Sequence, residues 1–206
     1  MAPEWRPAVR QAMREAAEAE NGAADRFNYR LEHVRAVVTL AKKLARLTGA
    51  DEEIAEAAAW LHDVSKRDGE EHAQTGAAFA AEFLAQTDFP PDKIPAVVRA
   101  IAEHQGLWRD EPLANLESMV LWDADKLSKL GLTAVIHFTG MILAGDASLT
   151  TEQLLDDLQS VDWQRRAVES MHTEPARRAA ATRLAAYERF VVQLEQELLG
   201  HDLETE

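Results

Sequence analysis

An imidazole stands where the sequence predicts a core side chain. His33 lies in the segment LEHVRAVVTLAKKL, where the helical period places it on the same face as Val37, Leu40 and Leu44. A buried polar ring needs a hydrogen-bond partner or a ligand. Neutral imidazole nitrogen is a common ligand of transition metals in proteins. His33 is therefore a candidate metal ligand.

A second imidazole and two carboxylates occur in similar surroundings. The adjacent pair His62 and Asp63 ends the apolar stretch DEEIAEAAAWLHD, and Asp125 lies in the hydrophobic stretch MVLWDADKLSKLGL. A buried carboxylate is costly unless a cation or hydrogen-bond donors neutralise it. Histidine nitrogen and aspartate oxygen bind divalent transition metals, and helical bundles build such sites from side chains on facing helices. With His33, these three residues predict a metal site between helices.

The composition is that of an acidic globular chain. Its 206 residues are 47% hydrophobic, enough for a substantial core in one domain, or in one domain with an appendage. The formal net charge of -14 disfavours a large nucleic-acid surface or an anionic membrane as partner, because both need a basic surface. A small anionic substrate is still compatible, since a metal and a few cations can reverse the potential within one cleft.

The chain contains no cysteine and no segment typical of membrane insertion or secretion. Without cysteine, disulfides and thiolate zinc sites are excluded, which fits a cytoplasmic protein. No apolar stretch approaches the ~20 residues of a membrane span, and the start MAPEWRPAVRQAMREAAEAENG lacks the apolar core of a secretory signal. We therefore expect a cytoplasmic protein with no membrane partner.

Nearly the whole sequence favours helix. Ala, Leu, Glu, Arg and Lys dominate, and no stretch alternates convincingly as a strand would. Gly49 and Gly145 fit helix C-termini, while Asp51 and Asn115 fit helix N-caps. The expected helices cover about 4–19, 31–47, 52–63, 70–86, 91–104, 115–130 and 132–145, followed beyond 150 by two long amphipathic helices broken near 172–175. This pattern predicts an all-α bundle with an N-terminal helix (1–27), a core (28–145) and C-terminal helices that pack on the core (146–206).

Five short motifs follow one another along the chain: EHVRAV, AAAWLHDVSK, EEHAQTGA, AIAEHQG and DADKL. In this order, and in these helical contexts, they resemble the HD-domain metal-dependent phosphohydrolases over roughly residues 28–140. The resemblance implies an HD-domain-like helical bundle with additional N- and C-terminal helices. In that family the first His, the His-Asp pair and the late Asp hold a divalent metal, which implies His33, His62, Asp63 and Asp125 here.

The number of metals stays open because His72 and His104 have two interpretations. Family members with two further histidines hold a second metal, which would bring in these residues and make Asp63 a bridge between the two ions. Otherwise His72 fits a solvated residue of a first helical turn, and His104 a favourable cation at a helix C-terminus. All candidate ligands offer nitrogen or oxygen, so one or two ions of Mn, Fe, Co, Ni or Zn are expected.

Several cations are candidates for binding phosphate. Lys66 follows Asp63 by three residues and could meet substrate oxygens, although it also fits an ordinary lysine at a helix C-terminus. Arg67, Arg109 and Lys126 are weaker candidates of the same kind.

Three other residues carry weaker signals. Trp108 could stack on a nucleobase or cover an edge of the core. Asp123 fits an exposed acid, or one that supports a metal ligand, better than a ligand itself. His172 matches no motif that would give it a role.

Together these residues predict an enzyme that hydrolyses a phosphate ester or anhydride in a nucleotide or related small phosphorylated metabolite, with Asp63 and Lys66 as catalytic residues. A bound divalent cation lowers the pKa of its water from ~15.7 towards 7 and polarises a phosphoryl oxygen. No Gly-rich phosphate loop or Ser-His-Asp arrangement is present, so kinase and acyl-transfer chemistry have no support. A mononuclear nucleoside monophosphatase and a catalytically silent, metal-bound helical interaction module stay open as alternatives.

Overall fold

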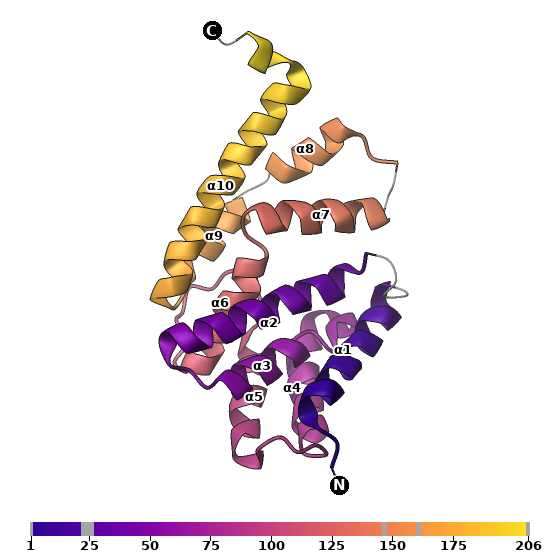
Figure 1. The fold of residues 1–206 in the computed structure, drawn as a ribbon, viewed down its shortest axis with the longest axis vertical. Helices are drawn as coiled ribbons and strands as arrows, with labels where there is room; N and C mark the ends of the chain where they lie inside the picture. The colour runs from indigo at the N-terminus through magenta and orange to yellow at the C-terminus, as the bar shows by residue number, and fades with distance from the viewer. Residues whose placement is uncertain (1, 22–26, 146–147, 160–161, 205–206) are drawn as a thin grey trace.

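The computed structural model describes residues 2–21, 27–145, 148–159 and 162–204, and within these ranges it contains helices and no strand (Figure 1). The expected all-α class is therefore confirmed. The α-helices are α1 (Trp5–Asn21), α2 (Tyr29–Thr48), α3 (Glu52–Leu61), α4 (His72–Leu84), α5 (Ile94–Glu103), α6 (Leu116–Ser128), α7 (Leu132–Gly145), α8 (Thr151–Gln159), α9 (Asp162–Glu169) and α10 (Glu174–Leu199). Short 3₁₀ turns cover η1 (Lys66–Glu71), η2 (Pro91–Lys93) and η3 (His201–Leu203).

Capping residues fix the ends of the helices that carry the metal-binding candidates. The side chain of Asn28 accepts a hydrogen bond from a backbone N–H in the first turn of α2. Gly49 ends the same helix in the left-handed conformation, with a φ of 81°. The Asp51 carboxylate accepts hydrogen bonds from two backbone N–H groups at the start of α3. These local signals set where α2 stops and α3 begins.

Three helix ends differ from the sequence expectation. α3 ends at Leu61 instead of Asp63, because the chain turns there into η1 before α4 begins at His72. Asn115 precedes α6, but its side chain does not cap the helix; its oxygen accepts a hydrogen bond from Arg99 at 2.9 Å instead. The first of the two long C-terminal helices is in fact two separate helices, α8 and α9.

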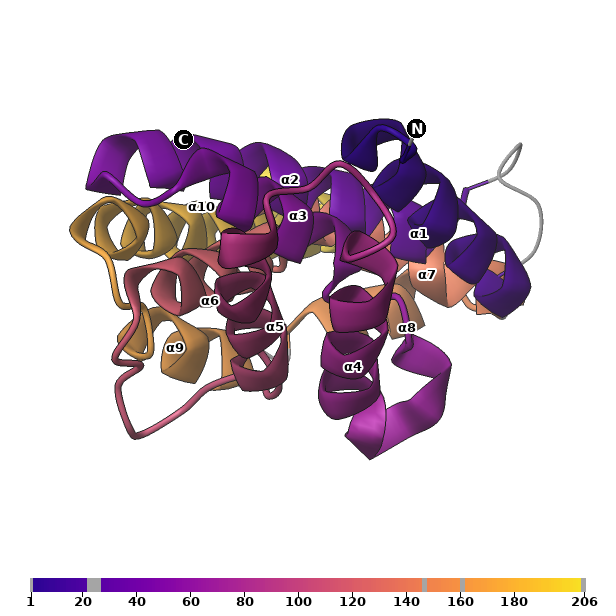
Figure 2. The ribbon, with the colours of Figure 1, turned by 90° about the horizontal axis from the view of Figure 1, so that it is seen from below.

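Helix α2 forms the centre of the bundle. It packs against α3 and α6 along its length, and α3, α5 and α6 pack against one another. Seen from below, α4 and α5 lie side by side beneath α2 and α3 (Figure 2). The main core also contains Trp5 and Met13 from α1, and Met171 and Ala176 from the C-terminal part. Both terminal segments therefore pack on the central bundle.

A second, smaller core joins α7, α8 and α10. Its buried side chains include Leu155, Tyr187 and Val191. The Tyr187 hydroxyl donates a hydrogen bond to the carbonyl oxygen of Leu158 at 2.8 Å, which connects α10 to α8. This part of the fold forms a separate layer beside α2 (Figure 1).

No single helix in the described ranges has the length and hydropathy of a membrane span. α6 and α7 meet those criteria only as a pair, and the two are bent by 68° where they join.

Candidate metal centre

Six polar side chains from five segments of the bundle meet at one point in the interior. α2 and the end of α3 deliver three of them, the start of α4 and the end of α5 one each, and α6 the last. None of the six is more than 5% exposed. The structure thus brings together every residue that the sequence singled out as a metal ligand: His33, His62, Asp63, His72, His104 and Asp125.

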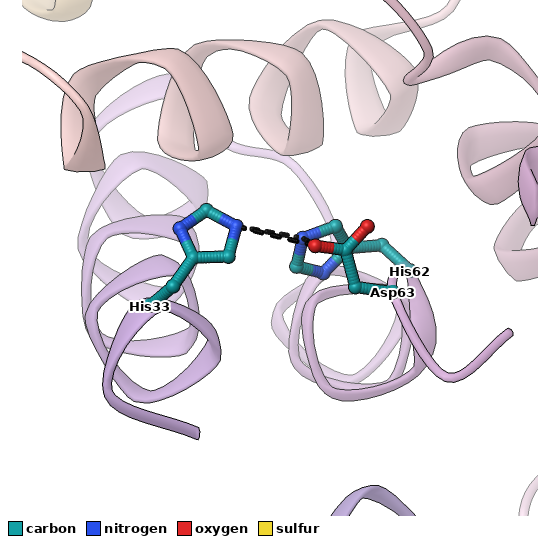
Figure 3. Close-up of side chains that lie close together, drawn as sticks. All are labelled: His33, His62 and Asp63. Atoms are coloured by element: carbon teal, nitrogen blue, oxygen red, sulfur yellow. Dashed lines mark hydrogen bonds and ion pairs between the residues drawn. The ribbon is translucent and has the colours of Figure 1, made fainter. Parts of the chain in front are cut away.

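One half of the site lies around Oδ2 of Asp63. Nε2 of His33 and Nε2 of His62 each lie 3.5 Å from this oxygen, and the two nitrogens are 3.3 Å apart. Figure 3 shows His33 facing the His62–Asp63 pair across the gap between α2 and α3. Oδ1 of Asp125 completes this half, at 3.2 Å from Nε2 of His33 and 4.0 Å from Nε2 of His62.

The other half lies around Oδ1 of the same aspartate. Nε2 of His72 and Nε2 of His104 lie 3.7 Å and 3.6 Å from Oδ1 of Asp63. Lys66 places its Nζ 3.0 Å from Nε2 of His72 and 3.4 Å from Oδ1 of Asp63. Each oxygen of one carboxylate therefore faces its own pair of imidazoles.

The remaining ring nitrogen, Nδ1, fixes the tautomer of all four histidines. In each ring Nδ1 lies within hydrogen-bond distance of an oxygen, so it carries the proton and leaves a lone pair on Nε2. The Ser128 hydroxyl donates to the carbonyl of Asp125 at 2.7 Å, so its oxygen is free to accept from His33. The Nδ1 partners are Ser128 Oγ for His33, Ala59 O for His62, Gly69 O for His72 and Ile101 O for His104.

A sharp backbone turn returns His72 to the site. Only nine positions separate it from Asp63, and the chain reverses between them within η1. Gly69 makes this reversal possible with a φ of 62°, a left-handed conformation that side chains disfavour. The carbonyl of the same glycine then accepts the hydrogen bond from Nδ1 of His72 at 2.6 Å.

Cationic side chains neutralise the two carboxylates. Arg30 donates to Oδ2 of Asp63, and Lys126 donates to Oδ2 of Asp125. Lys129 places its Nζ 2.7 Å from Oδ1 of Asp125. With Lys66, four cations lie against two carboxylates, so the local charge is opposite to that of the chain as a whole.

Three residues at the centre, Arg30, Ser128 and Lys129, were not expected from the sequence. Each stands one helical turn from a predicted ligand: Arg30 three residues before His33, and the other two three and four residues after Asp125. That spacing places side chains on one helix face, and it is the signal that could have identified them.

The protonation states suit metal binding. Burial lowers the pKa of His62 to about 3, so its ring is neutral at neutral pH. Burial alone would raise the pKa of Asp63, but the surrounding imidazoles and a guanidinium hold it well below its usual range. Burial opposes ionisation of Asp125 too, and the adjacent Lys126 and Lys129 likewise keep the pKa of its carboxyl well below the usual range. The site therefore presents a neutral imidazole at His62 and ionised carboxylates at Asp63 and Asp125.

The donor set fits divalent cations. His33, His62 and Asp63 place one donor atom each within 4.8 Å of one another, and Asp63, His72 and His104 do the same. Within the described residues, Nε2 of His104 is buried and has no hydrogen-bond partner. A lone pair buried in this way calls for a ligand. Nitrogen and oxygen donors in two adjoining groups match the preferences of Mn, Fe, Co, Ni and Zn.

A cavity of about 440 Å³ opens onto the centre. Lys66, Lys126 and Lys129 line it together with His72 and His104. Its size is that of a small-molecule site. The cavity gives an anionic ligand access to the histidines along a wall of lysines.

Two other candidates for phosphate binding lie elsewhere. Arg67 is exposed and does not line this cavity. Arg109 donates to two backbone carbonyls and lines a different cavity. Trp108, the candidate for stacking on a nucleobase, is covered on one face by the guanidinium of Arg166, which lies 4.0 Å from the ring centre. Of the weaker cationic candidates, only Lys126 lies at the centre.

Asp123 has a structural role. It is fully buried, so the expectation of an exposed acid is wrong. Its carboxylate accepts hydrogen bonds from the backbone N–H groups of His172 and Thr173, both at 2.8 Å, and from the Thr173 hydroxyl at 2.7 Å. His172 in turn accepts a hydrogen bond from the backbone N–H of Leu113 at 2.9 Å. These bonds attach the start of α10 to α6.

The fold and this centre define an all-α protein with a buried cluster of His and Asp side chains that could hold metal ions. The family model of the HD domain matches residues 30–130. The chain therefore belongs to the HD-domain family. A comparison with curated proteins gave no significant match.

Solved structures of similar fold support this assignment. A protein described as a predicted HD superfamily hydrolase from an uncultured Thermotogales bacterium is 23% identical, with a TM-score of 0.67 and coverage of 96% of this chain and 93% of its own. YpgQ of Bacillus subtilis, solved in complex with ADP, is 18% identical, with a TM-score of 0.68 and coverage of 94% of both chains. An HD-superfamily hydrolase from Bacillus thuringiensis is 20% identical, with a TM-score of 0.67 and coverage of 94% and 98%.

Proposed function

We propose that this protein is a metal-dependent phosphohydrolase that cleaves a phosphate ester or anhydride bond in a nucleotide or a related small phosphorylated metabolite. The observation that carries the proposal is the arrangement around Asp63, where each carboxylate oxygen faces two Nε2 atoms at 3.5 to 3.7 Å. A carboxylate between two pairs of imidazoles is suited to bridging two cations. The nucleotide part draws support from the similar fold that was solved with ADP.

The residues divide into two ligand groups. His33, His62, Asp63 and Asp125 would hold one cation, and Asp63 with His72 and His104 would hold the second. When bound there, such cations supply Lewis acidity towards a phosphoryl oxygen and lower the pKa of a coordinated water.

The surrounding side chains bind and orient the substrate. Lys66 is one-third exposed and faces the cavity, so its ammonium can reach a phosphoryl oxygen and counter the charge that develops during cleavage. Lys129 and Lys126 add two further cationic side chains to the lining of the same cavity. Ser128 and the three carbonyls hold the imidazole rings in place, which keeps Nε2 of each aimed inwards.

Metal analysis and a substrate screen test the proposal together. We expect the purified protein to contain about two divalent ions per chain and to hydrolyse p-nitrophenyl phosphate or members of a nucleotide panel with added Mn²⁺, with activity lost in chelator. One ion and cleavage confined to nucleoside monophosphates would favour the mononuclear monophosphatase. Bound metal without turnover of any compound in a broad screen would favour the silent interaction module.

A further inference from the structure

A second cavity, of about 470 Å³, adjoins the metal centre. It lies among α2, α7, α8 and α9 and shares two wall residues, Leu107 and Lys129, with the cavity over the metal ligands. Tyr29 connects them further, because its ring lines the second cavity and stacks on His33 with ring centres 5.9 Å apart and planes at 11°. A ligand could therefore extend from one cavity into the other.

The wall of the second cavity is mainly apolar and aromatic. Phe138 from α7 and Trp163 from α9 meet edge to face, with ring centres 5.8 Å apart at 73°. Leu158 from α8 is buried beside them. Among the described residues of this wall, Asp157 supplies the one carboxylate. Aromatic rings with a few placed polar groups are typical of a site for a planar organic ligand.

Lys129 lies at the boundary between the cavity over the metal ligands and the second, apolar cavity. Its ammonium lies 2.7 Å from Oδ1 of Asp125, at the end where the phosphate would bind. The same residue also lines the second cavity, where a lysine alkyl chain can contribute apolar surface. The two adjoining cavities together therefore suit a ligand that is anionic at one end and flat and apolar at the other.

We propose that the second cavity is the base subsite of a nucleotide substrate, and that Asp157 selects bases that carry an exocyclic amino group. The inference rests on the proposed phosphohydrolase function. A base can pack against the rings of Trp163 and Phe138. A carboxylate oxygen accepts hydrogen bonds and does not donate them. Asp157 would therefore accept a hydrogen bond from an amino group of the base and repel a carbonyl oxygen placed against it. An alkyl chain would fill the apolar wall without using the carboxylate.

Matched nucleotides test the selection. Adenine and unsubstituted purine nucleotides, and guanine and hypoxanthine nucleotides, differ within each pair by one amino group. We expect kcat/KM to favour the amino member of at least one pair by about tenfold, the effect of one hydrogen bond to a charged acceptor. Asp157→Asn should reduce that ratio to near one. Asp156→Asn is the matched control, because it removes the neighbouring exposed acid of α8, which does not line the cavity.

Trp163→Leu provides a second test of the same subsite. It should raise KM for nucleotides severalfold, and by a larger factor than KM for glycerol phosphate, which has no flat ring to pack against Trp163. Circular dichroism of all variants checks that each is folded.

The outcomes separate this inference from the proposed function. Cleavage of p-nitrophenyl phosphate without an amino-base preference, or with a preference that survives Asp157→Asn, would overturn the base subsite and leave the phosphohydrolase standing. Better cleavage of prenyl or acyl phosphates than of any nucleotide would overturn it too. If no phosphorylated compound is cleaved, equilibrium dialysis decides: selective binding of amino-base nucleotides by the wild type, lost in Asp157→Asn, would support the subsite although the hydrolase proposal had failed.

Discussion

The metal centre and the second cavity lie side by side but are built in contrasting ways. The six candidate ligands are buried within the main core, and hydrogen bonds to fixed oxygens orient each of their imidazole rings. The second cavity is bordered by α7 and α8, which pack on a small core and leave side chains such as Ile136 and Met141 68% and 41% exposed. Reacting atoms need tight positioning, and the buried, hydrogen-bonded imidazoles provide it.

Because the two regions are built differently, substitutions in them should have different effects. Changes among the ligands should affect metal binding and the cleavage of every substrate. Changes around the second cavity should alter the choice of substrate and leave the chemistry intact. The following experiments, from the largest expected effect to the smallest, probe that division.

Asp63→Ala should have the largest effect, because it removes the carboxylate shared by both ligand groups. We expect loss of bound metal and of activity together, with helix content largely retained. Elemental analysis, circular dichroism and turnover measure the three properties. Glu56→Gln is the matched control: Glu56, within α3, is another buried, ion-paired acid, but its partners are Arg6, Arg10 and Lys42, outside the site. Full metal occupancy in Asp63→Ala would refute the assignment.

Removing one imidazole from the second ligand group should halve the metal content. His72→Ala or His104→Ala should leave about one ion per chain, held by the other group, and should lower kcat by at least about a hundredfold, since one clamp on the phosphoryl group is lost. Metal analysis beside kinetics measures both quantities. A wild type with a single ion that neither substitution affects would give these histidines a role in binding substrate.

Lys66→Ala should weaken catalysis without displacing metal. We expect kcat/KM to fall by at least about tenfold, or ~1.4 kcal/mol, because a cation that faces the cavity is lost. Arg67→Ala, at the exposed neighbouring position, is the control and should have little effect. Identical kinetics for the two variants would make Lys66 an ordinary surface lysine.

Acid should destabilise the metal-stripped protein through the metal centre. The folded state holds the pKa of His62 at about 3, below its ordinary value of 6.5, so the unfolded state binds the extra proton as pH falls between these values. The free energy of unfolding should therefore decrease by up to about 1.4 kcal/mol per pH unit below about 6.5. Thermal unfolding from pH 7 to pH 5 measures the slope, which His62→Gln should flatten. His201→Gln, at an exposed histidine, should not change it.

The smallest effect is expected in the second core. Val191→Ala removes two buried methyl groups between α10 and its neighbours and should cost about 1–2 kcal/mol of unfolding free energy. Metal content should stay as in the wild type. Leu61→Ala, in the fully buried main core beside the ligands, should cost about 2–5 kcal/mol. Loss of metal in Val191→Ala would show that the two regions are not independent.

Local sequence determined the helices and the set of residues at the centre. Asp51 and Gly49 mark helix ends through their own backbone chemistry, and the structure places both as expected. The period of α2 identified His33 as an inward-facing imidazole because its helical neighbours are apolar. Such signals act within a few residues, so they can be read without knowing how the helices pack. The ligand roles of these residues are still predictions.

Only the tertiary structure decided how the two oxygens of Asp63 divide four imidazoles, that Ser128 supports His33 from 95 positions away, and that Asp123 attaches α6 to the start of α10. It also placed Asp157 and Trp163 in the wall of the cavity that adjoins the one over the metal ligands. The physical reason is the same in each case. These contacts join helices far apart in the chain, and their geometry depends on how whole helices pack, which residue type and spacing do not specify.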